Sequence, residues 1–217
     1  MEHSFWHQRW QNSEIGFHEP EANPDLVQHW PALGLPVGSR VFVPLCGKTL
    51  DIGWLLSQGY RVAGAELSEL AIEQLFSELG LTPQITELVT ESGKLRHYQA
   101  ENIDIFVGDI FTLSAEQLGP IDGIYDRAAL IALPEPMRQR YVVHLRAITR
   151  QAPQLLITLQ YNTALLQGPP FHISHEEVQE HYAASYAVTL VEDSELEGGL
   201  KGVCDARVNI WALRNKA

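Results

Sequence analysis

The stretch Arg40–Glu66, RVFVPLCGKTLDIGWLLSQGYRVAGAE, decides the fold of this chain. Its first apolar run, residues 41–43, is typical of a strand that is buried on both faces, and Pro44–Gly47 supplies a turn. Thr49 is a good N-cap for the helix that follows, and Gly59 is a good terminator. The first part of the stretch therefore predicts a strand, a tight turn and a helix.

The second part of the stretch predicts another buried strand, Tyr60–Ala65, which places Glu66 at its carboxyl end. In nucleotide-binding α/β folds an acid at this place accepts hydrogen bonds from ribose hydroxyls. A carboxylate there favours an adenosine without a 2′-phosphate. The order of elements thus predicts a nucleotide-binding crevice.

Three interpretations of the turn are open. The triplet Gly47-Lys48-Thr49 is similar to the end of a P-loop, but Phe42 stands where that motif requires its first glycine. The three glycines of the dinucleotide fingerprint are also missing, and a single close backbone approach favours a smaller cofactor without a pyrophosphate. The third interpretation is a turn that binds no ligand.

Composition bounds the class of protein. With 217 residues and 45% apolar residues, the chain is long enough for one domain with a substantial core. Its 27 acids and 15 bases give a net charge of −12, which opposes binding to nucleic acid and to anionic lipid surfaces. Cys46 and Cys204 are the only cysteines, and no long hydrophobic span is present. We therefore expect a cytoplasmic protein that acts on a small molecule, without a nucleic-acid or membrane partner.

The N-terminal segment differs from the rest. Residues 1–38 contain Trp6, Trp10 and Trp30 among polar residues and have no strand-like run, which predicts a helical extension. Trp6 and Trp10 are four residues apart, so they share one face of a helix. That face packs on the core or covers a site, and both functions are compatible. We expect a single domain of residues 1–217, with 1–38 as a helical lid and 39–217 as the core.

Further patterns predict an α/β protein. The predicted elements are a helix after Ser68, a hairpin within 82–102, strands at 103–107, 123–126 and 155–159, a helix at 135–150, a helix that opens with the capping box Ser174/Glu177, and final strands at 186–191 and 207–213. Buried strands that alternate with helices favour a mostly parallel, twisted sheet with helices on both faces.

Side chains with chemical potential follow four of these strands. Leu45 follows the first, Glu66 the second, Asp109-Ile110 the third and Asp126-Arg127 the fourth. Because ligands of open α/β sheets bind beyond the carboxyl ends of the strands, we expect these residues at one crevice. Local alternatives remain: Glu66 and Asp109 as helix-start acids, and Arg127 in an ion pair with Asp126.

The chain resembles the thiopurine S-methyltransferase family of bacterial type along nearly its whole length. The segments that carry the resemblance are FWHQRWQ, GFHE, VPLCGKTLD, GAELSELAI, GDIF, YDRAALIALP and GPPF. The resemblance implies a Rossmann-like class I S-adenosylmethionine-dependent methyltransferase, monomeric, with an antiparallel last strand. It also implies transfer of a methyl group to a small aromatic or heterocyclic thiol such as a thiopurine. Methylation of selenium or tellurium species is an alternative, and a non-catalytic S-adenosylmethionine-binding module is another.

The resemblance also implies the site residues. The cofactor contacts would be Trp10, Leu45, Glu66, Asp109, Ile110 and Arg127, and the substrate walls would be Phe17, Pro169, Pro170 and Phe171. An aromatic thiol ionises near neutral pH, so no protein nucleophile is required. Arg127 would then be the catalytic residue, because its positive charge favours the thiolate.

Other reactive side chains fit structural roles better. Cys46 reads as a small buried apolar residue. His172, His175 and His181 lack the spacing of a zinc helix, so we expect no metal site. Arg138 and Arg140 are predicted to lie on a solvated helix face.

Overall fold

The computed structural model describes residues 3–90 and 92–216, in which nine strands form one sheet of order β3-β4-β5-β2-β1-β6-β7-β9-β8. The five central strands are parallel, as predicted. They are β1 (Arg40–Pro44), β2 (Arg61–Glu66), β5 (Ile103–Val107), β6 (Gly123–Arg127) and β7 (Gln154–Tyr161). Apolar side chains on both faces of these strands explain their central position.

Antiparallel strands extend both edges of the sheet. The predicted hairpin is formed by β3 (Gln84–Thr90) and β4 (Gly93–Ala100), and β4 pairs with β5. At the other edge, β9 (Ala206–Asn215) lies between β7 and β8 (Tyr186–Glu195) and is antiparallel to both. The prediction of an antiparallel last strand is therefore confirmed.

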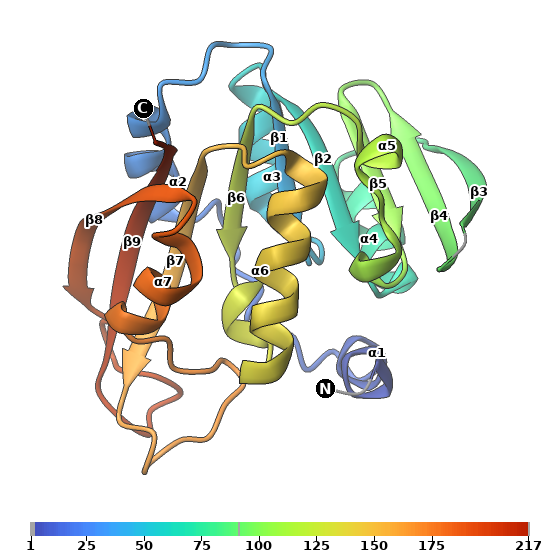
Figure 1. The fold of residues 1–217 in the computed structure, drawn as a ribbon. Helices are drawn as coiled ribbons and strands as arrows, with labels where there is room; N and C mark the ends of the chain where they lie inside the picture. Colours follow the sequence, from blue (N-terminus) through green and yellow to red (C-terminus); the bar gives the residue numbers. More distant parts are fainter. Residues whose placement is uncertain (1–2, 91, 217) are drawn as a thin grey trace.

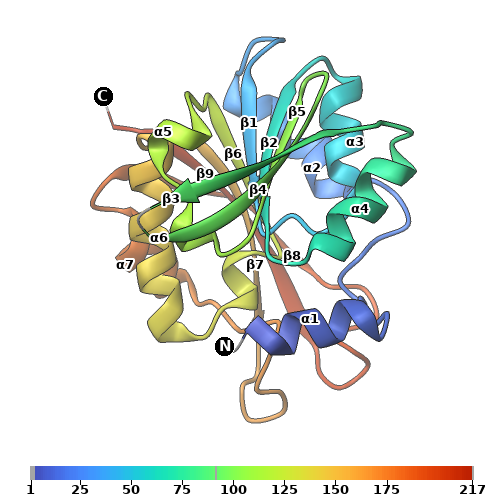
Figure 2. The ribbon, with the colours of Figure 1, turned by 90° about the vertical axis from the view of Figure 1, so that its right-hand side faces the viewer.

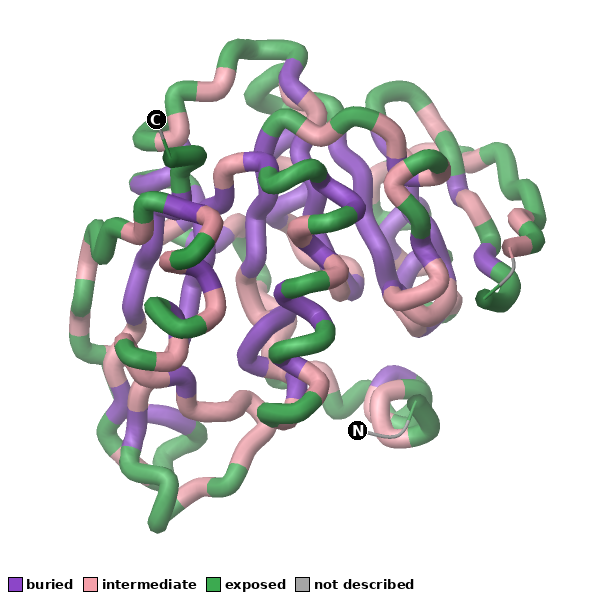
Figure 3. The backbone as a smooth tube through the Cα atoms, in the orientation of Figure 1, coloured by how far each residue is buried: buried purple, intermediate pink, exposed green. Residues whose placement is uncertain are grey.

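Helices cover both faces of the sheet, so the molecule has three layers (Figures 1 and 2). One face carries α2 (Pro24–His29), α3 (Leu50–Ser57) and α4 (Glu69–Glu78), and the other carries α5 (Ala115–Leu118), α6 (Glu135–Thr149) and α7 (His175–Tyr182). Each face has its own apolar cluster, and buried residues concentrate in the central strands and the helix sides that face them (Figure 3). No helix in the described part of the chain is long and apolar enough to cross a membrane.

The N-terminal residues contribute to two parts of this architecture. The helix α1 (His3–Gln11) lies beyond the carboxyl ends of the parallel strands (Figure 1). In contrast, α2 and the short 3-10 helix η1 (Trp30–Leu33) bury Leu26 and Trp30 in the cluster shared with α3 and α4. Only the segment before α2 is therefore placed to cover the end of the sheet.

Most predicted helix starts are present. Thr49 caps α3, Ser68 caps α4, and prolines stand at the start of α6. The predicted box at α7 is only half formed: Ser174 accepts from the Glu177 backbone N–H, but the Glu177 carboxylate turns away from the cap. A complete capping box occurs instead on α5.

The prediction that Arg138 lies on a solvated face is wrong. Arg138 is 6% exposed, and its Nε donates to the Glu177 carboxylate at 2.6 Å. Its Nη1 donates to the Leu133 carbonyl at 2.9 Å. The helix α6 turns this side chain toward α7, where the ion pair offsets the cost of burial. This contact also explains why Glu177 does not complete its capping box.

A buried carboxylate joins β6 to the elements that follow it. Asp126 is fully buried and accepts from the Tyr141 hydroxyl at 2.7 Å and from the Leu130 N–H at 3.1 Å. Burial raises the pKa of Asp126 to about 6, although these hydrogen bonds oppose the shift. The carboxylate thus links β6, the 3-10 helix η3 (Leu130–Ala132) and α6. Above about pH 6 the carboxylate is ionised, and its burial then lowers the stability of the folded protein.

We predict that the free energy of unfolding of the wild type, relative to that of Asp126→Asn, increases as the pH falls from 7 to 4. The folded protein binds the proton at about pH 6, whereas an unfolded chain binds it near 3.8. Protonation in that window therefore favours the folded state. Urea unfolding of both proteins at several pH values measures the difference, in which the titration of all other groups cancels. Parallel stability profiles would contradict this assignment.

Candidate functional site

The carboxyl ends of the central strands enclose a cavity of about 720 Å³. The strand β1 lies between β2 and β6. The chain continues from β1 to β2 and β5 on one side of it, and then crosses to β6 and β7 on the other side. Such a reversal of strand order opens a crevice between the connections that follow the two strands. Nine of the ten predicted site residues line the cavity: Trp10, Phe17, Leu45, Glu66, Asp109, Ile110, Arg127, Pro169 and Pro170.

The backbone is distorted at both strands that flank the reversal. Leu45, directly after β1, has a φ of 46°, and Ala128, directly after β6, has a φ of 61°. Non-glycine residues rarely adopt this left-handed conformation because the side chain crowds the backbone. Both residues line the cavity. The surrounding structure therefore maintains strained turns on the two sides of one crevice.

Glu66 ties the turn after β1 to the start of α4. Its Oε2 accepts from the Gly47 N–H at 2.8 Å, and its Oε1 accepts from the Ser68 N–H at 2.8 Å. The side chain is 6% exposed, and burial raises its pKa, an effect that these backbone hydrogen bonds oppose. A carboxylate can accept about four hydrogen bonds, so Glu66, which lines the cavity, retains some accepting capacity beyond the backbone donors. This acid is more than a helix-start residue, since Ser68 is the cap of α4.

Trp10 covers the turn. A side chain at Gly47 would lie 2.9 Å from the Trp10 indole, so only glycine allows this close approach. The ring of Phe17 meets Trp10 edge to face at 5.7 Å and Trp6 at 6.0 Å. All three aromatic rings line the cavity, so the shared face of α1 packs on the turn and covers the crevice at once.

Arg127 binds the N-terminal segment and not its neighbour in sequence. Its Nη1 donates to the Phe17 carbonyl at 3.0 Å, and its Nη2 donates to the Glu19 carboxylate. The alternative of an ion pair with Asp126 is wrong, because successive side chains of a strand point to opposite faces. Asp126 faces Tyr141 in the core, and Arg127 faces the cavity.

Asp109 and Ile110 lie at the end of β5. Asp109 Oδ1 accepts from the Phe111 N–H at 3.0 Å and caps the 3-10 helix η2 (Ile110–Thr112), so the capping interpretation holds. Both residues also line the cavity, and Oδ2 lies 3.7 Å from His3 Nε2. The carboxylate therefore keeps one oxygen for other partners.

Residues from the C-terminal half of the chain also line the cavity. Pro169 and Pro170 line the cavity, and Lys201 Nζ donates to the Pro169 carbonyl at 2.7 Å. Phe171, which was expected in the same wall, is not among the lining residues. Its ring lies beneath the Arg138 guanidinium, at 5.9 Å. Phe171 thus packs near Arg138 and does not line the cavity.

Sequence reasoning missed several lining residues. His18 and Glu19 belong to the quoted segment GFHE, so their proximity to Phe17 was an available signal. Burial, with a smaller effect from Lys48, lowers the pKa of His18. Leu196 and Leu200, from the loop between β8 and β9, carried no local signal, because only the tertiary fold brings that loop to the cavity.

The remaining reactive side chains have structural partners. Burial raises the pKa of Cys46 well above its ordinary value, and the nearby Glu66 carboxylate adds to the shift, so the thiol stays protonated. His172 Nδ1 accepts from the Tyr161 N–H at 3.0 Å, and the ring of His175 packs edge-on against Trp211 at 5.0 Å.

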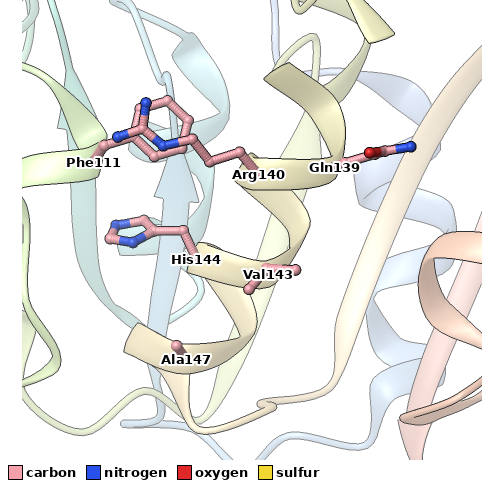
Figure 4. Close-up of a pocket in the computed structure, with 6 residues that line it drawn as sticks. All are labelled: Phe111, Gln139, Arg140, Val143, His144 and Ala147. Carbon is pink, nitrogen blue, oxygen red and sulfur yellow. The ribbon is translucent and has the colours of Figure 1, made fainter. Parts of the chain in front are cut away.

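A second hollow lies on the outer surface of α6, beside η2 (Figure 4). The Arg140 guanidinium lies over the ring of Phe111, 3.8 Å from its centroid, and His144 Nε2 donates to the Ile110 carbonyl at 2.8 Å. Arg140 is exposed, as predicted, and the stacking fixes its direction. Phe111 and Arg140 also line the large cavity, so they form a wall between the two hollows.

Comparisons with known proteins agree with this geometry. The family model described as thiopurine S-methyltransferase matches residues 1–211. The thiopurine S-methyltransferase of Xanthobacter autotrophicus is 52% identical over 98% of this chain and 99% of its own length. That of Gluconobacter oxydans is 50% identical over 95% and 92%. The crystal structure of the Burkholderia thailandensis 1,6-didemethyltoxoflavin-N1-methyltransferase, with bound S-adenosylhomocysteine, is 16% identical, covers 98% of this chain and 87% of its own, and has a TM-score of 0.65. The chain thus has the class I methyltransferase fold and belongs to the thiopurine S-methyltransferase family of S-adenosylmethionine-dependent methyltransferases.

Proposed function

We propose that this enzyme methylates the sulfur of a small aromatic or heterocyclic thiol such as a thiopurine. The observation that carries the proposal is the position of Arg127 inside a largely apolar cavity. Phe17, Pro169 and Pro170 also line this cavity. Flat apolar walls suit a planar ring, and a guanidinium among them favours an anionic sulfur. The names of the 50–52% identical relatives support the same acceptor.

The residues at the strand ends suit the cofactor. A cavity of about 720 Å³ has the size of a small-molecule site. We assign Glu66 to the ribose hydroxyls, because its buried carboxylate has lone pairs that the backbone does not use. Leu45 and Trp10 would contact the cofactor around the turn, and Asp109 with Ile110 would meet the adenine. S-adenosylmethionine supplies, when bound, a methyl group activated by a sulfonium.

Arg127 would assist by lowering the pKa of the acceptor thiol. The acceptor thiol would release its proton to solvent and take the methyl group as a thiolate, leaving the cofactor as a neutral thioether. Charge would then balance without a protein nucleophile. Approach geometry and exclusion of water would provide most of the rate. We propose that α1 and the residues up to Glu19 close the cavity and exclude water, because Trp6, Trp10 and Phe17 line it.

A panel of acceptors tests the proposed function. Pure protein is incubated with methyl-labelled S-adenosylmethionine and matched thiols, selenols, amines and oxyanions. We expect label on aryl and heterocyclic thiols at rates at least about tenfold above those on amines. Preferential labelling of selenium or tellurium species would favour metalloid methylation. Binding without any transfer would favour a non-catalytic module.

The acidic limb of the rate profile should follow the acceptor. With two aryl thiols of similar shape whose solution pKa values differ by about two units, we expect the limb of kcat/KM to move with the thiol. Arg127→Gln should move the acidic limb to higher pH by the same amount for both thiols, because the thiolate loses a favourable charge. Arg127→Lys should reverse part of this shift.

The matched control is Arg61→Gln, an exposed arginine that donates to the Gly38 carbonyl at the amino end of β2. It should leave both limbs in place. A limb at one pH for both thiols would contradict ionisation of the free acceptor and would indicate a protein base, for which His18 and Glu19 are the first candidates in the cavity.

We predict that Glu66→Gln weakens S-adenosylhomocysteine binding by about 1.5–3 kcal/mol through loss of charge-assisted hydrogen bonds. The raised pKa of Glu66 adds a pH effect: affinity of the wild type falls as the pH drops through that pKa, and Glu66→Gln lacks this dependence. Calorimetry at several pH values measures both. Glu73→Gln, an exposed acid on α4, is the control. Equal affinity of wild type and Glu66→Gln would remove Glu66 from the cofactor site.

A further inference from the structure

A row of four polar residues in the cavity leads to Arg127, and three of the four have no role in the function proposed above. It consists of Asp51, Tyr125, Asn23 and Glu19, all of which line the cavity. The row starts between α3 and β6 in the core and ends at Arg127. In Figure 2, the chain between α1 and α2, residues 12–23, rises along the side of the sheet that carries α3. We call residues 12–23 the connecting segment.

Asp51 anchors the connecting segment to the core. It lies in the first turn of α3, is 1% exposed, and accepts from the Asn23 backbone N–H at 2.7 Å and from the Tyr125 hydroxyl at 3.1 Å. Burial, and next the Asp51 charge, raise the pKa of Tyr125 well above its ordinary value, so the phenol remains a donor. In the described residues, no Lys, Arg or His forms an ion pair with Asp51. A buried carboxylate without a cation is costly, and its two hydrogen bonds and the start of α3 offset that cost.

Asn23 connects Asp51 to Glu19. Its Oδ1 accepts from the N–H groups of Asp25 and Leu26 and thereby caps α2. Its Nδ2 donates to Glu19 Oε2 at 3.1 Å. Hydrogen bonds at the backbone N–H and at both polar side-chain atoms hold Asn23 in one orientation, so the amide presents a fixed donor to Glu19.

Glu19 completes the row at Arg127. The Glu19 carboxylate accepts from Arg127 Nη2, while Arg127 Nη1 donates to the Phe17 carbonyl. The connecting segment therefore occupies two corners of the guanidinium and sets the direction of its plane. Phe17 comes from the same segment, so the orientation of Arg127 and the position of an aromatic wall depend on one set of hydrogen bonds.

We propose that Asp51 and Asn23 are positioning residues that act on the acceptor through Glu19 and Arg127. This inference rests on the proposed role of Arg127. A purely structural role would lower stability alone, whereas a positioning role lowers transfer only where Arg127 is present to be positioned.

The test is a double-mutant cycle between Asn23→Ser and Arg127→Gln. Serine keeps the cap of α2 but removes the amide donor to Glu19. We expect Asn23→Ser to lower kcat/KM for an aryl thiol about five- to tenfold in the wild-type background, with little further loss in Arg127→Gln. Additive losses in the two backgrounds would overturn the inference, and so would an Asn23→Ser protein with full activity.

Two further variants keep the test independent of folding defects. Asp51→Asn retains an oxygen for the Asn23 N–H and should restore most of the transfer that Asp51→Ala loses. The matched control is Asp104→Asn, a half-buried acid that pairs with Arg40 and His97 near the amino end of β5. Its effect on kcat/KM should be small and equal in both backgrounds.

Amide hydrogen exchange, measured without ligand, tests the anchoring contacts separately from the roles of Arg127 and of the positioning residues. Amides of the connecting segment should exchange faster in Asn23→Ser and Asp51→Ala, and unchanged exchange would overturn the anchoring contacts themselves. If Arg127→Gln retains full transfer, the role of Arg127 in the proposed function is wrong and this inference fails with it. If Arg127→Gln loses transfer and Asn23→Ser does not, only this inference fails.

Discussion

The site depends on one pair of hydrogen bonds, from the N–H groups of Gly47 and Ser68 to the buried carboxylate of Glu66. They join the turn after β1 to the start of α4, and so fix the distance between two neighbouring strand ends. A buried carboxylate is stable only where donors surround it, so the turn and the acid require each other.

The N-terminal segment converts this open crevice into an enclosed cavity. The indole of Trp10 packs on the bare backbone of Gly47, and Arg127 holds the segment again through Phe17 and Glu19. The first contact is with the turn after β1, and the second is with the last residue of β6. The class I methyltransferase fold supplies the strand ends, and the N-terminal segment adds the aromatic rings of Trp6, Trp10 and Phe17. The cover and part of the apolar lining therefore come from the same short stretch of chain.

The cavity that contains Arg127 is lined by distant segments of the chain. Phe17 comes from the cover, Pro169 and Pro170 from the connection after β7, and Leu200 from the loop between β8 and β9. Their common feature is apolar surface around one guanidinium. Because a negatively charged acid, Glu19, already binds that guanidinium, the site balances charge before any acceptor enters. An anionic sulfur would then compete with Glu19 for Arg127, or share Arg127 with it.

The sequence alone predicted the elements that depend on local pattern. The apolar run before Pro44–Gly47, the caps at Thr49 and Ser68, and the hairpin within 82–102 all appear as expected. The convergence of Leu45, Glu66, Asp109 and Arg127 also followed, since the carboxyl ends of parallel strands share one edge of a sheet.

Only the tertiary structure decided which partners these side chains choose. Arg127 pairs with Glu19, more than a hundred residues away, because strand alternation turns its neighbour Asp126 into the core. Arg138 is buried where α7 supplies Glu177 as its partner, and Phe171 packs near Arg138 and does not line the cavity. Periodicity and capping report contacts within a few residues. Partners that are brought together by folding leave no such local signal.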